Sequence, residues 1–422
     1  MELKEAREMA VGLAAKPVPE TVELGRAAGR VLAESVRTLC DMPANPLSRW
    51  DGFALISSEC AQASPERSVI LRVAREETTA GKIPPKAASG TCVRIMTGGV
   101  LPAGMDAVVP FEEAERCEKG LIFTGPVLSG AGVIPPGSEA RNNDVLLREG
   151  DVLTPTRIGV AAATGRQSIR VVRRPRVAIL ATGDELRGSG RGDESVSIFC
   201  NNSLLLACLV RVAGGEPIEL GVAPDDPGVI YSRLQNAQAD LVITTGGMGK
   251  GSKDFISEVW AKLGLEIRFD RLNIVPGKGS GLATGNGRIF LGLPGTPGAA
   301  RIIFEEIGAP VIRSYLGLNF PPDFALEAVA MRPMEKREGF YRALDGVLEM
   351  RESFCAFLPG RPQSGWRPPM MSSFRNNPAY ALLPPGDSPV AEGQRVSIKI
   401  PDLPLASWAI LISGDAAGRG AV

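Results

Sequence analysis

The chain contains no histidine among its 422 residues. This absence excludes Ser–His and Cys–His catalytic pairs, histidine general bases and histidine metal ligands. Any bound metal should therefore be a hard, oxygen-ligated ion such as Mg²⁺. An excess charge of one sign is also missing, because 47 Lys and Arg balance 47 Asp and Glu. This balance argues against bulk nucleic acid or an anionic membrane surface as a partner.

Long hydrophobic runs are absent too, since no apolar stretch approaches the ~20 residues of a membrane span. The sequence begins Met-Glu-Leu-Lys-Glu-Ala, which is acidic and helical in character and unlike a signal peptide. The seven cysteines are odd in number and lack Cys-x-x-Cys spacing, which is typical of a reduced protein. We therefore expect a cytoplasmic protein with no membrane partner and no nucleic-acid partner.

The most informative feature that is present is a repeated turn. Three times a short apolar strand runs into a glycine turn that is expected to open a helix, at 181–186, 244–249 and 292–297. Parallel strands bring such turns to one edge of a sheet, where open α/β proteins bind ligands. Free N–H groups at the helix starts favour phosphate there. Four acids are expected at this edge and indicate a divalent cation beside the phosphate: Asp184, Glu185, Asp226 and Asp254.

Length and sequence texture predict several domains, about three at ~150 residues each from length alone. Helical patterns occupy 1–40 and 141–173, which we interpret as a helical linker domain. The inserted segment 41–140 is β-rich, with short strands between Gly and Pro. Strand and helix alternate over 174–318, which predicts a parallel sheet with crossover helices, and 319–405 is predicted to be a β-barrel. Within the α/β segment one apolar helical stripe is predicted from Leu204, Leu205, Cys208, Leu209 and Val212.

Eight short motifs follow one another along nearly the whole chain. They are Ser48–Ala54, Arg94–Gly98, Leu101–Val109, Thr182–Leu186, Asp225–Pro227, Thr245–Gly247, Pro276–Lys278 and Gly292–Gly295. Each motif alone is weak, but the ordered set is specific. This order resembles the MoeA/gephyrin E-domain family, the molybdopterin molybdenumtransferases.

The resemblance implies a four-domain elongated protomer with a parallel-sheet α/β molybdopterin-binding domain, a β-rich inserted domain and a C-terminal β-barrel. It also implies a homodimer with a site near the dimer contact. The implied activity inserts molybdate into adenylylated molybdopterin with Mg²⁺ and releases AMP. The implied partners are the pterin nucleotide, molybdate, and a molybdoenzyme or cofactor-synthesis protein.

The resemblance further implies the residues of the site. The implied catalytic residues are Asp51, Glu185, Asp226, Asp254 and Lys278, and the implied metal ligands are Glu185, Asp254 and Asp226. The implied pterin-nucleotide contacts are Thr97, Gly98, Thr182, Gly183, Thr245, Gly246, Gly247, Pro294, Gly295, Pro297 and Arg342.

Each charged candidate also has a purely structural interpretation. Glu185 can be a helix-start acid beside the helix dipole. Asp226 and Asp254 can be N-caps, and Pro227 after Asp226 is typical of that role. Asp51 before Gly52 and Thr97 before Gly98 can be ordinary turn residues, and Lys278 can be a solvated lysine. These alternatives stay open at the level of sequence.

Several positions depart from the pattern of the family, and three of them lie in what the resemblance implies is its oxyanion pocket. Val275 replaces a lysine, and Gly249 and Ala299 replace two serines. Lys250, Arg301 and Arg342 are candidates to supply donors instead. The departures leave three alternative hypotheses: a catalytically weak carrier or chaperone of a pterin nucleotide, a dimeric scaffold, and a different anhydride hydrolase.

Overall fold

The computed structural model describes residues 1–78, 81, 83–86, 88–187, 198–249, 255–318, 325–360, 379–401, 403–405 and 407. The chain divides into two compact units. The larger unit comprises Met1–Glu34, Glu149–Ile158 and Gln167–Val422, and the smaller comprises Ser35–Arg148 and Gly159–Arg166. Within the described ranges, none of the helices has the length and apolar character needed to span a bilayer.

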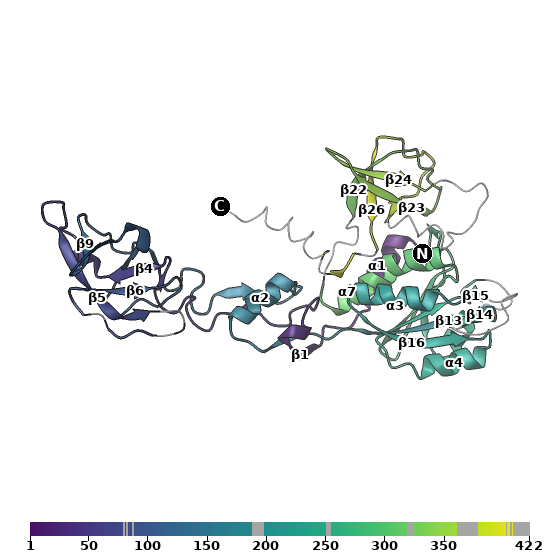
Figure 1. Ribbon diagram of the computed structural model, residues 1–422. Coiled ribbons are helices and arrows are strands. Elements are labelled where there is room, and N and C mark those ends of the chain that lie inside the picture. The colour runs from purple at the N-terminus through teal and green to yellow at the C-terminus, as the bar shows by residue number, and fades with distance from the viewer. Residues whose placement is uncertain are drawn as a thin grey trace. The chain divides into compact units, whose positions relative to one another are not determined.

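A six-stranded sheet forms the centre of the larger unit (Figure 1). Its order is β16 (Glu216–Ala223), β13 (Arg176–Thr182), β17 (Leu241–Thr245), β21 (Arg288–Leu293), β20 (Gly281–Gly285) and β18 (Glu266–Phe269). The first four strands are parallel, which confirms the predicted parallel sheet. The last two are antiparallel and form an edge that the sequence analysis did not predict. A two-residue Asn286-Gly287 turn with positive φ at both residues joins β20 to β21, which is the preferred geometry for a tight hairpin.

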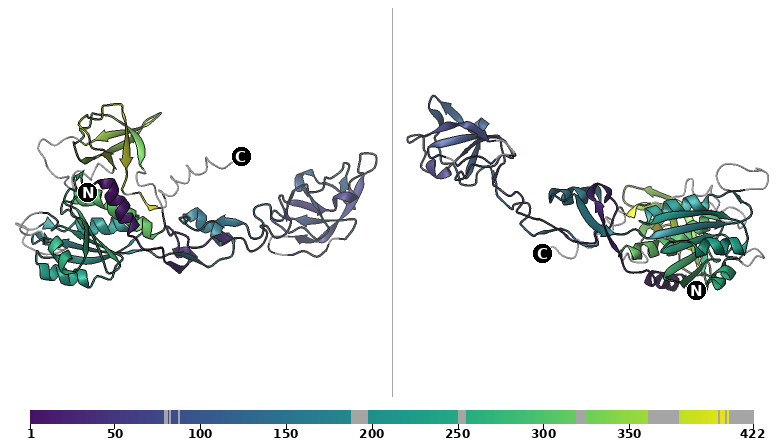
Figure 2. Two further views of the ribbon diagram at one scale, coloured as in Figure 1. Left: turned by 180° about the vertical axis from the view of Figure 1, so that it is seen from behind. Right: turned by 90° about the horizontal axis from the view of Figure 1, so that it is seen from below.

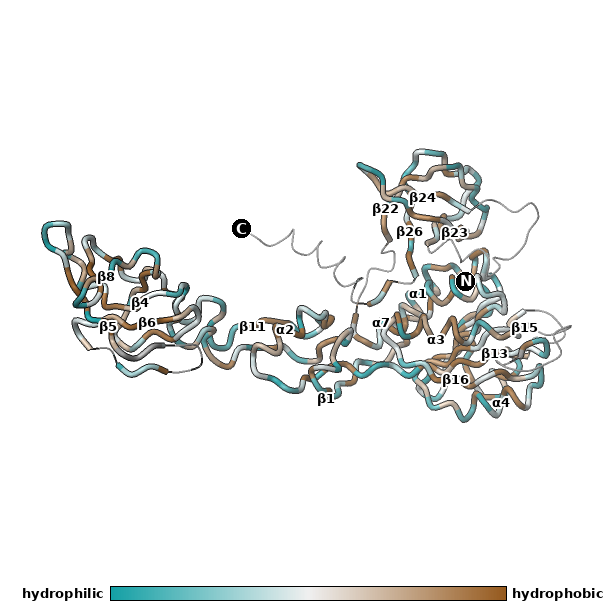
Figure 3. Tube along the Cα trace, in the orientation of Figure 1, coloured by the Kyte–Doolittle hydropathy of each residue, from teal (hydrophilic) through white to brown (hydrophobic). Residues whose placement is uncertain are grey.

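Helices cover both faces of this sheet (Figures 1 and 2). Strand β13 is buried on both sides from Val177 onward, and its residues from Val177 to Ala181 are all apolar. Val177 and Ile179 face a core shared with α1 (Leu3–Gly12), α3 (Asn202–Val212), α6 (Pro297–Ile303) and α7 (Ala309–Tyr315). Ala178 and Leu180 face a second core shared with α4 (Pro227–Gln235) and α5 (Ile256–Lys262). Hydrophobic colours accordingly gather around β13 in Figure 3.

Two details of the helices differ from expectation. The predicted stripe on α3 is wrong in part, because Leu204 and Cys208 are exposed while Leu206, Ala207 and Val210 are buried. The sheet and α6 pack against the face of α3 that contains Ser203, Leu206, Ala207 and Val210. These residues therefore face the core in place of Leu204 and Cys208. The first glycine turn also does not open directly into a helix, since β14 (Leu186–Arg187) follows it and pairs with β15 (Ile198–Phe199). Between α6 and α7 the helix widens into a π-helical turn, Phe304–Gly308.

The C-terminal region of the larger unit forms a closed five-stranded barrel, as predicted. Strands β23 (Tyr341–Met350), β24 (Cys355–Pro359), β22 (Leu326–Ala330), β26 (Arg395–Lys399) and β25 (Ala379–Leu383) pair in that order, and β25 pairs back to β23. Phe357, Ala381 and Ile398 lie in the barrel core. The short β19 (Ile274–Val275) adds to β23 in parallel, so the barrel is hydrogen-bonded to the segment that connects β18 and β20 of the α/β sheet.

The segments predicted to be a helical linker contain strands as well as helices. Strand β1 (Pro19–Glu23) pairs with β12 (Ser168–Val172), and β2 (Val36–Arg37) pairs with β11 (Val145–Leu147). The β-branched residues of β1 and β12 favour strand over helix. Helix α2 (Pro155–Ala163) and a 3₁₀ turn at Leu24–Arg26 complete these segments.

The smaller unit is β-rich, as predicted. Its sheet has the order β7 (Ala107–Pro110), β4 (Gly52–Leu55), β6 (Thr91–Ile95), β5 (Val69–Thr78), β9 (Gly120–Phe123) and β8 (Glu115–Cys117). A further pair joins β3 (Leu47–Ser48) to β10 (Val133–Ile134), and 3₁₀ turns lie at Ser57–Glu59 and Phe111–Glu113. Phe53, Leu55 and Leu121 are among the residues of its core.

Candidate functional site

A cavity of about 390 Å³ lies in the larger unit where β13, β17 and β21 end. All three glycine turns contribute to its wall, so the structure brings them together as the sequence predicted. Its volume lies within the range of small-molecule sites. Its lining residues are Thr182, Gly183, Glu185, Leu186, Asn202, Asp225, Thr245, Gly246, Gly247, Met248, Gly249, Gly279, Pro294 and Gly295.

The turns can approach one another because glycine occupies the positions where they come closest. Gly246 has φ +96°, and a Cβ there would lie 2.5 Å from the Thr182 carbonyl oxygen. Gly183 has φ +149°, and a Cβ there would lie 2.6 Å from a carboxylate oxygen of Glu185. L-residues with a side chain rarely adopt such φ values. Glycine at these positions therefore lets the first and second turns pack together and lets the Glu185 carboxylate lie against the backbone.

Asn202, the first residue of α3, joins the second and third turns. Its Nδ2 donates to Thr245 Oγ1 and to the Gly295 carbonyl oxygen, both at 2.8 Å. Thr245 Oγ1 in turn donates to the Pro294 carbonyl oxygen at 3.1 Å. These bonds fix the distance between the ends of β17 and β21 from the side of α3. Both side chains are more than nine-tenths buried.

Two carboxylates line the cavity, from Glu185 and Asp225. Asp225 is held by reciprocal bonds with Asp184: each backbone N–H donates to the other side chain, at 3.0 and 3.3 Å. Among the described residues no three acidic, histidine or cysteine side chains converge as a metal cage. Mg²⁺, however, is commonly held by one or two carboxylates together with substrate phosphates. The carboxylates of this wall fit that mode of binding.

The structure gives Asp226 a different place from Asp225. Asp226 caps α4, since its Oδ1 accepts from the N–H groups of Gly228 and Val229 at 2.7 and 3.0 Å. Its side chain is exposed, and the cavity wall contains Asp225 instead. The simpler N-cap interpretation thus describes Asp226 in this structure. Asp254, the other acid assigned to the metal, lies outside the described residues.

Three further candidates lie outside the wall of the cavity. The Lys278 ammonium is 5.1 Å from the centre of the Phe340 ring, while the next residue, Gly279, lines the cavity. Arg342 donates to the Glu335 carbonyl oxygen at 2.7 Å. Pro297 is the first residue of α6.

Asp51, Thr97 and Gly98 belong to the smaller unit. Asp51 Oδ1 accepts hydrogen bonds from the Thr97 N–H at 2.7 Å and the Thr97 hydroxyl at 2.8 Å. These bonds, the backbone one first, lower the pKa of the Asp51 carboxyl. Gly98 follows with φ +76° and donates to the Ser48 carbonyl oxygen at 2.8 Å. The motif is therefore a well-ordered turn that keeps one carboxylate ionised at its surface.

The altered oxyanion-pocket positions fall in different surroundings. Gly249 lines the cavity, and Ala299 is buried in α6. Val275 pairs in register with Arg342 across β19 and β23. Arg301 is buried and forms an ion pair with Asp345 at 2.9 Å. Lys250 lies outside the described residues.

Six wall residues were not among the predicted site residues: Leu186, Asn202, Asp225, Met248, Gly249 and Gly279. Asp225 stands beside Asp226 in the same motif, and the cap signal of Asp226-Pro227 could have pointed to Asp225 as the acid left for the cavity. The Met248 side chain occupies space that two glycines, distant from it in sequence, leave free. A Cβ at Gly292 would lie 2.4 Å from its sulfur, and a Cβ at Gly281 would lie 2.5 Å from its methyl carbon.

Comparisons with known proteins agree with this architecture. Residues 1–165 match the family described as "MoeA N-terminal region (domain I and II)", and residues 178–314 match "Probable molybdopterin binding domain". A molybdopterin molybdenumtransferase from Bacillus subtilis is 30% identical over 387 residues, covering 90% of this chain and 89% of the relative. One from Nostoc sp. is 31% identical over 405 residues, covering 90% and 88%.

A solved structure of the molybdopterin biosynthesis MoeA protein from Pyrococcus horikoshii aligns with a TM-score of 0.84 at 26% identity, covering 95% of this chain and 99% of that one. A second structure of the MoeA protein from that organism gives 0.76 at 24% identity. The fold and the cavity thus define a transferase of molybdenum cofactor biosynthesis. The chain belongs to the MoeA family of molybdopterin molybdenumtransferases.

Proposed function

We propose that this chain inserts molybdenum from molybdate into adenylylated molybdopterin, in a Mg²⁺-dependent reaction that releases AMP. The observation that carries the proposal is the cavity, because three glycine turns and two carboxylates meet there. Glycine turns at the ends of parallel strands let a phosphate approach the backbone closely, and carboxylates beside a phosphate suit a hard cation. A scaffold that only dimerises would need neither feature.

Each part of the wall has a role in this proposal. The turns at Gly183, Gly246 and Gly295 bind and orient the phosphates of the pterin nucleotide. Glu185 and Asp225 would hold Mg²⁺, with Asp184 orienting Asp225 through their reciprocal bonds. Bound Mg²⁺ would neutralise charge that develops on the phosphoanhydride oxygens. Met248, which is buried in the wall, limits the access of water to the inner end of the cavity.

The proposal extends to the remaining candidates. Lys278 and Arg342 would supply positive charge for molybdate, and Asp254 would be a further metal ligand. Thr97, Gly98, Pro297 and Asp51 are proposed as contacts of the pterin nucleotide or catalytic groups, as the resemblance to the family implies. We also propose a homodimer that passes its product to a molybdoenzyme or another cofactor-synthesis protein. All seven cysteines are free, which supports a reducing, cytoplasmic location.

The test uses the purified full chain with adenylylated molybdopterin, molybdate and Mg²⁺. We expect AMP release and active cofactor, both lost when Mg²⁺ is chelated. Binding of the pterin nucleotide without AMP release would instead establish the carrier hypothesis. Cleavage of other nucleotide anhydrides at the same rate would establish a general hydrolase, and absence of any binding would leave the scaffold.

A further inference from the structure

Two buried polar atoms in the cavity wall have no hydrogen-bond partner among the described residues. They are Thr182 Oγ1 and Asn202 Oδ1, from side chains that are 3% and 6% exposed. Native proteins leave few buried polar groups unsatisfied, because each one costs free energy. Both residues line the same cavity, so a ligand in the cavity can satisfy both atoms.

The hydrogen-bond network fixes which atom of the Asn202 amide is unsatisfied. The Gly295 carbonyl oxygen can only accept, so the group facing it at 2.8 Å must be the NH₂. The other amide hydrogen goes to Thr245 Oγ1, whose own hydrogen goes to the Pro294 carbonyl oxygen. Both hydrogens of the amide are therefore used, and the remaining atom, Oδ1, is an acceptor.

Because Asn202 Oδ1 is an acceptor, it can bind only a ligand group that donates a hydrogen bond. Phosphate and molybdate oxygens carry no proton at neutral pH to donate, so they would leave Oδ1 unsatisfied and repel it. The exocyclic amino group of a heterocycle satisfies it. The Thr182 hydroxyl can donate or accept, so it suits a neighbouring ring nitrogen or oxygen.

We infer that Asn202 determines specificity by accepting a hydrogen bond from the exocyclic amino group of the heterocycle of the ligand, with Thr182 as the second contact. This inference rests on the proposed function, because it takes the ligand to be a pterin nucleotide. It also sets an orientation, in which the heterocycle lies beside Asn202 and the phosphates lie beside Glu185 and Asp225.

Both heterocycles of adenylylated molybdopterin carry an amino group, so the test uses two matched pairs of probes. Pterin is compared with lumazine, in which an oxo group replaces the amino group, and AMP is compared with IMP, which has the same change on its purine. The wild-type full chain should bind the amino member of one pair about tenfold more tightly or better, the effect of one good hydrogen bond against one unsatisfied acceptor. The pair that shows the preference identifies which heterocycle Asn202 contacts.

Three variants separate recognition from structure. Thr182→Val is nearly isosteric and removes an unsatisfied hydroxyl, so the melting temperature without ligand should stay the same or rise while affinity falls severalfold. Asn202→Leu should abolish the amino preference. Thr245→Val removes a partner of Asn202 but leaves Oδ1 in place, so the preference should persist. A purely structural role of these residues predicts the opposite for Thr182→Val, a lower melting temperature with unchanged affinity.

The inference and the proposed function fail in different ways. If AMP is released from the full substrate but wild type binds both members of each pair equally, the inference is overturned and the proposed function stands. If Asn202→Leu and Thr245→Val lose the preference equally, Asn202 acts only by joining the turns and the inference is again overturned. If no probe binds and no AMP is released, both are overturned.

Discussion

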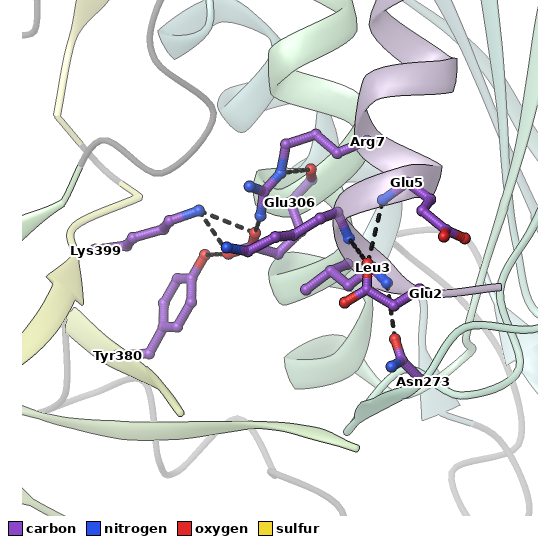
Figure 4. Close-up of polar contacts among 9 residues, drawn as sticks. Glu2, Leu3, Glu5, Arg7, Asn273, Glu306, Tyr380 and Lys399 are labelled. Atoms are coloured by element: carbon purple, nitrogen blue, oxygen red, sulfur yellow. Dashed lines mark hydrogen bonds and ion pairs between the residues drawn. The ribbon is translucent and has the colours of Figure 1, made fainter. Parts of the chain in front are cut away.

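Arg7 of α1 and Glu306 of the π-helical turn form a fully buried ion pair, in which Arg7 also donates from Nε to the Glu306 carbonyl oxygen at 3.0 Å (Figure 4). The Glu306 carboxylate further accepts from the Tyr380 hydroxyl at 2.5 Å and from the Lys399 ammonium at 2.9 Å to each oxygen. The first helix and two barrel strands are thereby joined to one carboxylate between α6 and α7. Removing one partner of such a cluster leaves uncompensated buried charge.

Glu306→Gln should therefore destabilise the larger unit by about 3–5 kcal/mol. Denaturant unfolding followed by tryptophan fluorescence would measure the change. Glu327→Gln is the matched control, because its ion pair with Arg395 is exposed on both sides and should contribute less than about 1 kcal/mol. Equal effects of the two substitutions would contradict the importance of burial.

Glu305, the neighbour of Glu306, should make stability depend on pH. Burial raises the pKa of Glu305 to about 7, although the positive charges of Arg313 and Lys399 oppose that shift. The folded state therefore holds this proton more strongly than the unfolded chain, and stability contributed by the protonated form is lost as pH rises from about 4.5 to about 7. Glu305→Gln should leave stability at pH 4 unchanged and raise it at pH 8 by up to about 3 kcal/mol. An identical pH profile in both proteins would refute this assignment.

The acids at the strand ends can be assigned by conservative substitution. Glu185→Gln and Asp225→Asn keep the shape of each side chain but remove the charge that a divalent ion needs, so Mg²⁺-dependent AMP release should fall at least tenfold. Asp226→Asn is the informative comparison, since asparagine caps a helix as well as aspartate does. If Asp226 is only the cap of α4, both cleavage and melting temperature stay near wild type. A loss of cleavage at unchanged melting temperature would restore its role at the metal.

Molybdate affinity should respond to the position where the family has a lysine. Val275 pairs in register with Arg342, so Val275→Lys would place two cations side by side unless an anion lies between them. We expect tighter molybdate binding that weakens with salt, and a lower melting temperature when no anion is present. Val275→Met controls for bulk. If the lysine variant binds molybdate no better than the methionine variant, this position lies outside the oxyanion pocket.

Gly246 should be essential to the cavity for a steric reason. Alanine at φ +96° would be strained, and its Cβ would lie 2.5 Å from the Thr182 carbonyl oxygen. Gly246→Ala should therefore lower the melting temperature and abolish binding of the pterin nucleotide. Gly264→Ala shares a positive φ, +70°, but has open space around the new methyl group. It should cost only about 1 kcal/mol and leave binding intact. Equal effects would show that backbone strain, not the contact, is responsible.

Local patterns in the sequence determined the elements around the site. The apolar runs of β13, β17 and β21 predict strands because they are buried on both faces, and the glycine turns after them predict an anion-binding edge. Asp226-Pro227 predicts the start of α4 for a local reason, the capping of two free N–H groups. The Asn286-Gly287 dipeptide carried an equally local hairpin signal, and weighing it would have predicted the antiparallel edge.

Tertiary structure decided the rest, because it depends on which surfaces meet. Helical periodicity on α3 admits two neighbouring apolar faces, and only packing against the sheet buries Leu206 instead of Leu204. Asp226-Pro227 indicates the cap of α4 locally, but only the folded path of the chain brings the neighbouring Asp225 into the cavity wall. Asn202 has no distinguishing local pattern, and its role arises from Thr245 and Gly295, which are distant in sequence. The sequence by itself thus determined the family, the strands and the glycine turns that follow them. The three-dimensional contacts determined which polar atoms remain unsatisfied in the cavity, and hence which part of a ligand they can bind.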